Sequence, residues 1–182
     1  MQAKQSYRIV TVLVGVIFFA LLAFTSTGYA QEAGKYKFSI GAGMGISANT
    51  PDDTAFATGV YADYYLTRDF SIGPLVQMGF TRDLFQIGVT GQAKYAFTLP
   101  GVPNFRPHVQ AGIGFIYADL EARDFRPREN DSSFLIPLGI GAEYKLTERV
   151  ILDTSVLFNF TNLDVQDRKF FVTWLIGVKF PF

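Results

Sequence analysis

Large apolar residues recur with a strict period of two along the last thirteen residues of the chain. Every second position carries a large apolar side chain: Phe170, Val172, Trp174, Ile176, Val178, Phe180 and Phe182. A period of two predicts a β-strand with one apolar face and one mixed face. The segment is longer than a typical strand of about five or six residues, which favours a tilted membrane crossing over a soluble sheet.

The same alternation recurs in seven further segments, so the chain contains eight predicted strands. The other seven span about 36–47, 56–66, 70–81, 84–97, 105–118, 134–146 and 150–160. Soluble sandwiches also have one apolar face, but here the opposite face is rich in Gly, Ser, Thr and Gln, which suits a crowded barrel interior. The sequence therefore predicts an all-β, eight-stranded antiparallel up-and-down transmembrane β-barrel. Pro74 and Pro137 fall inside strands, where we expect bulges or shifted boundaries.

A repeated motif, Tyr-x-[Leu/Phe]-Thr, closes three of the even-numbered predicted strands, at residues 64–67, 95–98 and 144–147. Aromatic residues at one height are typical of a membrane interface. We expect one such girdle to contain Tyr64, Tyr95, Tyr144, Phe180 and Phe182. The connections at this end are short, whereas the segments 48–55, 119–133 and 161–169 are longer and charged. Short periplasmic turns and longer outer loops then predict that both termini lie in the periplasm.

The N-terminus has the order of features of a secretory signal peptide. Lys4 and Arg8 precede an apolar run over residues 9–24, and small residues lead up to Ala30. A retained membrane anchor is the alternative, but the run is short for a span of about 20 residues. The sequence thus predicts a signal peptide at residues 1–30, cleaved after Ala30, and one barrel domain at residues 31–182 in the outer membrane.

Composition narrows the function classes. The chain has 16 Lys and Arg, 16 Asp and Glu, and no Cys. Removal of residues 1–30 takes away two cations and no acid, which leaves a net charge of −2. This nearly balanced charge gives no reason to expect a nucleic-acid partner. Without disulfides, closure of the sheet on itself is the way to leave no exposed edge.

The candidate chemistry lies in the interior and in one loop. Eight ionisable residues are predicted to point inward as a lumen polar network: Asp63, Lys94, Arg106, His108, Glu143, Lys145, Asp153 and Lys179. They either pair and fill the interior or line a conduit, and the narrowness of eight strands favours pairing. Three loop arginines could bind lipopolysaccharide phosphates or a protein partner, unless the loop is simply solvated: Arg123, Arg126 and Arg128.

No catalytic, metal or cofactor site is predicted. The single histidine, His108, is expected near the periplasmic end and inward-facing, with no Ser two residues later as in deacylase barrels. Nucleophilic catalysis needs an activated nucleophile beside a base. No Cys/His cluster, HExxH motif or phosphate-binding glycine loop is present.

The signal peptide, eight alternating segments, Tyr-x-Leu-Thr turns and terminal Phe182 together resemble the small OmpA- and OmpX-type outer-membrane barrels. The resemblance covers the whole mature chain but not the peptidoglycan-binding domain of full-length OmpA proteins. It implies a non-enzymatic, monomeric protein of the envelope that acts through its loops and contacts membrane lipid and lipopolysaccharide. It also implies that the barrel-assembly machinery reads Phe182. The alternatives are a narrow OmpW-like channel for small or apolar solutes and, less favoured, a lipid-A-modifying enzyme.

Overall fold

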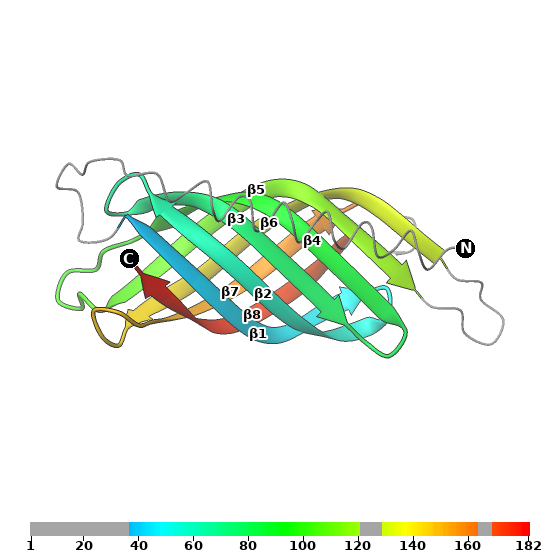
Figure 1. Ribbon diagram of the computed structural model, residues 1–182, viewed down its shortest axis with the longest axis horizontal. Helices are drawn as coiled ribbons and strands as arrows, with labels where there is room; N and C mark the ends of the chain where they lie inside the picture. Colours follow the sequence, from blue (N-terminus) through cyan, green and yellow to red (C-terminus); the bar gives the residue numbers. More distant parts are fainter. Residues whose placement is uncertain (1–36, 121–128, 164–168) are drawn as a thin grey trace. The chain divides into compact units, whose positions relative to one another are not determined.

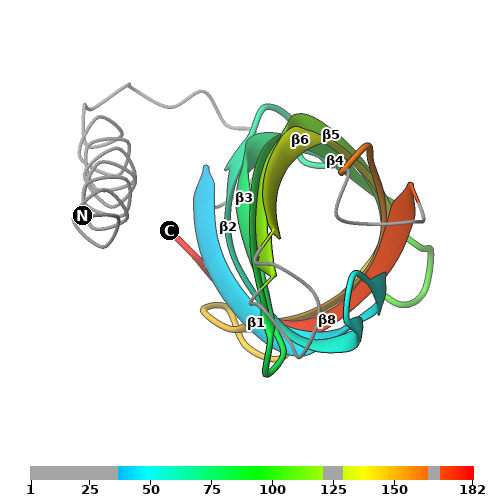
Figure 2. The same ribbon diagram turned by 90° about the vertical axis from the view of Figure 1, so that its right-hand side faces the viewer.

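Eight antiparallel strands form a closed barrel in the computed structural model, which describes residues 37–120, 129–163 and 169–182. Each strand pairs with its neighbours in sequence, and the last pairs with the first (Figures 1 and 2). The strands are β1 (Phe38–Thr50), β2 (Asp53–Tyr65), β3 (Phe70–Phe80), β4 (Leu84–Ala96), β5 (Phe105–Leu120), β6 (Glu129–Lys145), β7 (Ile151–Thr161) and β8 (Phe170–Pro181). The predicted fold class is confirmed.

The two ends of the barrel differ in their connections. The turn end holds the connections 66–69, 97–104 and 146–150 together with the C-terminus, and the described connections of the loop end are 51–52 and 81–83 (Figure 1). The expected long loop at 48–55 is wrong, because β1 and β2 extend to a two-residue connection. Similarly, β5 and β6 continue to Leu120 and Glu129, so the paired strands occupy much of the expected 119–133 loop.

The threonine of the repeated motif stabilises two of the tight turns. The hydroxyl of Thr67 accepts hydrogen bonds from the amides of Asp69 and Phe70, at 3.3 and 3.0 Å. The hydroxyl of Thr147 accepts one from the amide of Arg149 at 3.2 Å. A Thr hydroxyl that bonds the backbone two or three residues ahead is a common turn device. The motif therefore encodes a strand followed by its turn.

Pro74 and Pro137 cause neither a bulge nor a shifted strand boundary, so that expectation is wrong. The register of β2 with β3 is the same on both sides of Pro74, with Tyr64 opposite Ile72 and Tyr61 opposite Leu75. A proline lacks only its own N–H, so the ladder loses a bond on one side while the strand continues. The register instead shifts between Ser47 and Thr50 in β1, near Asn49 with its positive φ of 66°.

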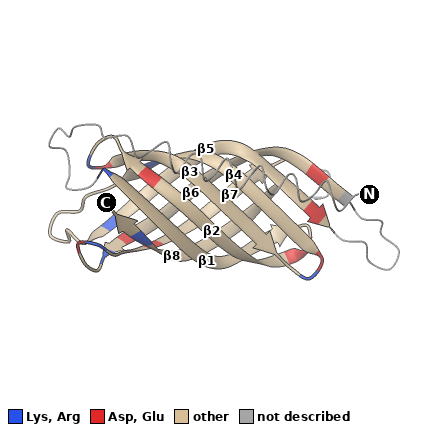
Figure 3. Ribbon diagram, viewed as in Figure 1, with Lys and Arg blue, Asp and Glu red and all other residues tan. Residues whose placement is uncertain are grey.

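The outer wall of the barrel is apolar, and most charged residues gather at its two ends (Figure 3). Met44, Ile113 and Phe115 are 63%, 69% and 75% exposed, whereas polar side chains such as Asn159 and Lys179 are fully buried in the interior. Such an inside-out arrangement suits a hydrocarbon surrounding. In the described ranges, no helix has the length and hydropathy needed to span a bilayer.

Candidate functional site in the barrel lumen

Five buried charged residues meet in the lumen near the turn end and form what we call the charge layer: Asp63, Lys94, Glu143, Asp153 and Lys179. The ammonium of Lys94 lies 3.4 Å from a carboxylate oxygen of Asp63, 3.4 Å from one of Asp153 and 3.8 Å from one of Glu143. Lys179 lies 3.1 Å from Asp63 and also bonds Glu143. Each carboxylate thus contacts at least one lysine.

Burial makes these pairs matter for stability. The side chains of the charge layer are between 0% and 8% exposed. Removal of an ion from water is costly unless a partner and further hydrogen bonds compensate for it. Two aromatic rings add to the compensation, because Lys94 lies 5.2 Å from the ring centre of Tyr61 and Lys179 lies 5.7 Å from that of Tyr65.

Strand alternation positions this layer. An inward-facing residue recurs at every second position, so five strands each place one charged side chain at a similar height. Gly41 of β1 provides the space for Tyr61, since a Cβ atom at Gly41 would lie 2.4 Å from that ring. The small inward residues of the sequence therefore make room for the large ones.

His108 joins the edge of the charge layer through a serine. Its Nε2 atom lies 3.2 Å from the hydroxyl of Ser155, which donates to Asp153 at 3.2 Å. Because the serine proton is used by Asp153, the imidazole Nε2–H is the donor to Ser155. This arrangement lacks the Asp-to-His contact that orients the base in a nucleophilic triad.

Two further layers lie above the charge layer toward the loop end. Along β7, Asp153 and Ser155 are followed by the inward residues Leu157 and Asn159. The first further layer is a small apolar cluster formed by Ala57, Leu75, Leu157 and Leu175, with Tyr61 packed against it. Above it, polar side chains bond across the lumen, with Asn159 bonded to Gln77 at 2.8 Å and to Thr173 at 3.1 Å.

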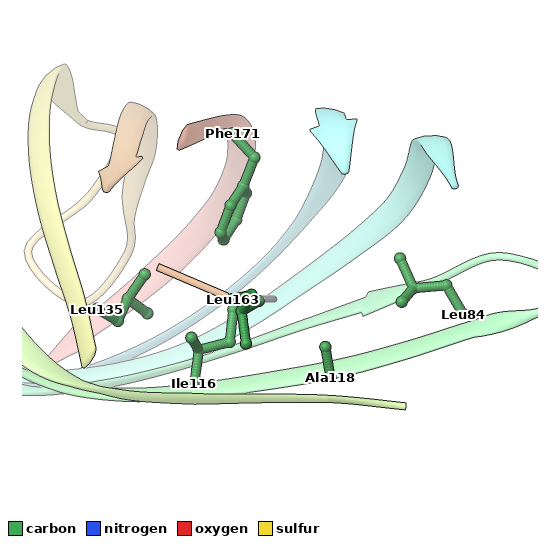
Figure 4. Packing of buried hydrophobic residues seen from close by; sticks show 6 residues of the cluster. All are labelled: Leu84, Ile116, Ala118, Leu135, Leu163 and Phe171. Carbon is green, nitrogen blue, oxygen red and sulfur yellow. The ribbon is translucent and has the colours of Figure 1, made fainter. Parts of the chain in front are cut away.

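A second apolar cluster, which we call the apolar cap, fills the lumen at the loop end. It contains Leu84, Ile116, Ala118, Leu135, Leu163 and Phe171, and their side chains converge inside the barrel (Figure 4). All six are at most 4% exposed. Sequence analysis missed this cluster, although a signal exists: near the loop end the alternation gives way to adjacent apolar pairs such as Phe134–Leu135 and Phe170–Phe171.

The structure does not bring all the predicted lumen residues together. Arg106 and Lys145 do not join the charge layer, which corrects the prediction for these two. Arg106 bonds Asp69 at 2.8 Å, and Lys145 bonds Glu148 at 2.6 Å, both in the turns. They lie at or next to strand ends, where a long cationic side chain reaches water and turn carboxylates.

The remaining predicted residues lie at the barrel surface or outside the described residues. The proposed girdle residues lie on the outer face at the turn end and are 39% to 67% exposed: Tyr64, Tyr95, Tyr144, Phe180 and Phe182. The loop arginines lie outside the described residues: Arg123, Arg126 and Arg128.

A cavity of about 20 Å³ lies beside the charge layer, bordered by Asp63, Lys94 and Gln110 among others. This is room for about one water molecule. In the described part of the chain, no group of three or more His, Asp or Glu side chains is placed to hold a metal ion.

A closed eight-stranded barrel with an apolar wall and a polar interior defines the class of outer-membrane β-barrel proteins. Residues 16–182 match the family described as outer membrane protein beta-barrel domain. The chain belongs to this family and is an outer-membrane β-barrel protein.

Solved structures with the same fold include three bacterial proteins. Neisserial surface protein A is 15% identical with a TM-score of 0.65, over 84% of this chain and 100% of that one. The N-terminal β-barrel domain of Pseudomonas aeruginosa OprF is 19% identical with a TM-score of 0.56, over 79% and 97% of the two chains. Ail of Yersinia pestis is 16% identical with a TM-score of 0.54, over 80% and 96%. No curated protein matches the sequence.

Proposed function

We propose that this protein is a closed, non-enzymatic and monomeric barrel of the outer membrane that contributes to envelope structure and surface interactions through its loop end. The observation that carries the proposal is the filled lumen. A charge layer, an apolar layer, a hydrogen-bonded polar layer and the apolar cap follow one another along the barrel. Charged pairs at one level and apolar side chains at another support a lumen without a continuous water path.

The surroundings of the one histidine support a non-enzymatic role. His108 is 2% exposed and Ser155 is 9% exposed, both inside the lumen. A lipid substrate would have to reach the serine hydroxyl through the wall or the filled interior. The hydroxyl also donates to Asp153, so its proton is held by a carboxylate instead of being removed by the imidazole. We assign His108 to packing and hydrogen bonding.

Single-channel recording of the folded, purified protein in planar bilayers tests the closed lumen. We expect no steady conductance, with a general porin recorded in parallel as the positive control. Folding is verified by the shift of the unheated protein on a denaturing gel. Steady and reproducible conductance would contradict the proposal and favour the narrow-channel alternative.

The surface role is proposed for the loop between β5 and β6. It contains three arginines that fit the bidentate binding of phosphate groups: Arg123, Arg126 and Arg128. Lipopolysaccharide, whose phosphates face the outside, is the proposed ligand. A variant with all three changed to Gln should lose binding to immobilised lipopolysaccharide, whereas Arg82→Gln between β3 and β4 should retain it. Equal binding by both variants would remove these arginines from the proposal.

A further inference from the structure

The two ends of the barrel carry opposite net charge (Figure 3). Outside the charge layer, the side chains of the turn end include five cations and two acids, Asp69 and Glu148, for a side-chain net charge of +3. The described residues of the loop end contain six acids and two cations, Arg82 and Lys169, for a net charge of −4. We call the five turn-end cations the basic rim: Lys37, Arg68, Arg106, Lys145 and Arg149.

The basic rim is distributed around the barrel. Lys37 precedes β1, Arg68 lies between β2 and β3, and Arg106 is the second residue of β5. Lys145 ends β6, and Arg149 follows in the connection to β7. Since the strands are arranged around the barrel in chain order, these positions fall on different sides of the same end. The cations are therefore spread along this end from the start of β1 to the turn between β6 and β7.

Two of these cations are available to a ligand. Arg106 is held by Asp69 at 2.8 Å and by the carbonyl oxygen of Arg68 at 2.9 Å, and Lys145 is held by Glu148. By contrast, Lys37, Arg68 and Arg149 form no ion pair with another described residue; Lys37 is half-buried, whereas the two arginines are exposed.

Hydrogen bonds to Thr67 and Thr147 order the turns that carry Arg68 and Arg149. Arg68 directly follows Thr67, whose hydroxyl binds the amides of Asp69 and Phe70. The amide of Arg149 itself donates to the hydroxyl of Thr147. These hydrogen bonds hold the turn backbone, so the Cα atom of each arginine has a defined position.

The height of the basic rim matches that of lipid headgroups. Tyr64 and Tyr144 lie on the outer face, and each precedes the start of its turn by two residues. Aromatic rings of this kind sit at the level of the headgroups. Two residues of strand correspond to about 7 Å. The arginines at the turns therefore lie just on the aqueous side of the rings, where lipid phosphates are found.

We propose that the basic rim binds anionic phospholipid headgroups of the leaflet at the turn end, with Arg68 and Arg149 as the main contacts. A guanidinium binds phosphate oxygens through paired N–H donors, and each cation at a membrane surface favours anionic lipid. Phosphatidylglycerol, with one net negative charge and a small headgroup, is the simplest ligand of this class. The assignment of this leaflet to the periplasmic side rests on the proposed function, whereas lipid binding itself does not.

The test measures lipid selectivity at the barrel surface. The full-length mature protein is reconstituted in phosphatidylcholine vesicles that contain spin-labelled phosphatidylglycerol or spin-labelled phosphatidylcholine. Electron paramagnetic resonance gives the association constant of each lipid with the protein. We expect the labelled phosphatidylglycerol to be preferred several-fold at low salt and the preference to fall in 0.5 M NaCl. The double variant Arg68→Gln with Arg149→Gln should abolish the preference for phosphatidylglycerol. Each cation is expected to contribute at most about a fivefold factor to that preference. The matched control Arg82→Gln, at the acidic loop end, should leave it unchanged.

Each outcome decides the proposal. An unchanged preference in the double variant, or no preference in the parent protein, would overturn it. Inorganic phosphate should lower the preference for phosphatidylglycerol no more than chloride does at the same ionic strength. Stronger competition by phosphate would indicate a site for the free ion and would also overturn the lipid assignment. Vesicle selectivity does not depend on conductance or on orientation in the cell, so failure here is distinguishable from failure of the closed-barrel function.

Discussion

The backbone amide of Phe182 donates a hydrogen bond to the carbonyl oxygen of Phe38 at 2.7 Å, where the last strand meets the first. The carbonyl oxygen of Phe182 in turn accepts a bond from the amide of Lys37 at 3.2 Å. The ring centres of Phe38 and Phe182 lie 6.5 Å apart. The C-terminal residue thus extends the seam between β1 and β8 beyond its last ladder pair, Ser39 with Pro181.

Deletion of Phe182 should impair assembly into the outer membrane while export across the inner membrane continues. The deletion removes the backbone hydrogen bonds of Phe182 with Lys37 and Phe38 and the terminal aromatic residue that the assembly machinery is proposed to read. The amount of heat-modifiable barrel in outer-membrane fractions measures assembly, and processed protein in the periplasm measures export. Phe182→Tyr keeps the backbone bonds and the ring and should assemble normally. Parent levels of folded barrel in the deletion mutant would contradict the prediction.

Replacement of Lys179 by Met should destabilise the barrel by about 3–5 kcal/mol, because it leaves buried carboxylates with too few partners. Lys179 is fully buried and bonds both Asp63 and Glu143. The measurement is reversible urea unfolding in lipid vesicles, followed by tryptophan fluorescence.

Lys145→Met is the matched control for this experiment. Its side chain is 38% exposed and its ammonium pairs with Glu148 at the surface, so the change should cost less than about 1 kcal/mol. The double variant Lys179→Met with Glu143→Gln should be more stable than Lys179→Met alone, since the unpaired charge is then removed as well. Equal losses for the two lysine variants would show that the charge layer contributes no more than a surface pair.

The fold was predictable because it follows from a local pattern. Alternation over each segment determines which side chains face out, and eight segments with short turns leave few topologies. The turn at the end of the Tyr-x-[Leu/Phe]-Thr motif was readable for the same reason, since Thr67 acts within one strand end and its turn. Strand ends were less predictable: β1 and β2 continue to residues 50 and 53. Pairing can extend through polar residues such as Thr50 and Asp53 whenever both strands have partners.

The interior was only partly predictable because it depends on contacts between distant strands. Alternation places both Lys94 and Arg106 inward, but it does not tell which cation meets which acid. The pairing of Lys94 with Asp153 joins residues 59 apart in sequence, whereas Arg106 meets Asp69 in a turn. The apolar cap was missed for a related reason. An inward Leu135 is apolar on the face that was expected to be polar, and its partners Leu84 and Phe171 come from other strands.

Phe170 and Phe171 are adjacent in sequence but should respond differently to replacement by Ala. Phe171 is 1% exposed inside the apolar cap, whereas Phe170 is 40% exposed on the outer face. Loss of a buried Phe leaves a cavity and costs about 3–5 kcal/mol. Phe170→Ala loses mainly contact with the surrounding lipid and should cost clearly less. Urea unfolding of both variants in the same vesicles compares them, and a larger loss for Phe170→Ala would reverse the assignment of the two faces.

Residues 1–30 should be absent from the protein in the outer membrane. The cationic start, apolar run and small residues before Ala30 predict cleavage at that position by signal peptidase. Intact mass spectrometry of the purified barrel should give a chain that begins at Gln31. A matched Ala30→Phe variant should be cleaved poorly, because the site requires a small residue. A mature mass that still includes Met1 would mean that the apolar run is retained as an anchor.

Two wall glycines should differ sharply when each is changed to Ala. A Cβ atom at Gly45 would lie 1.8 Å from the carbonyl oxygen of Trp174 in the neighbouring strand, whereas one at Gly91 would meet no atom within 4 Å. Gly45→Ala therefore forces β1 and β8 apart at the closing seam and should destabilise the barrel by about 1–3 kcal/mol. Gly91→Ala reduces the freedom of the unfolded chain without a clash and should be neutral or stabilise by up to about 1 kcal/mol. Urea unfolding measures both, and the rate of barrel formation should fall for Gly45→Ala alone. If the two variants have the same free energy of unfolding, the close approach of β1 and β8 at Gly45 is not required for closure of the barrel.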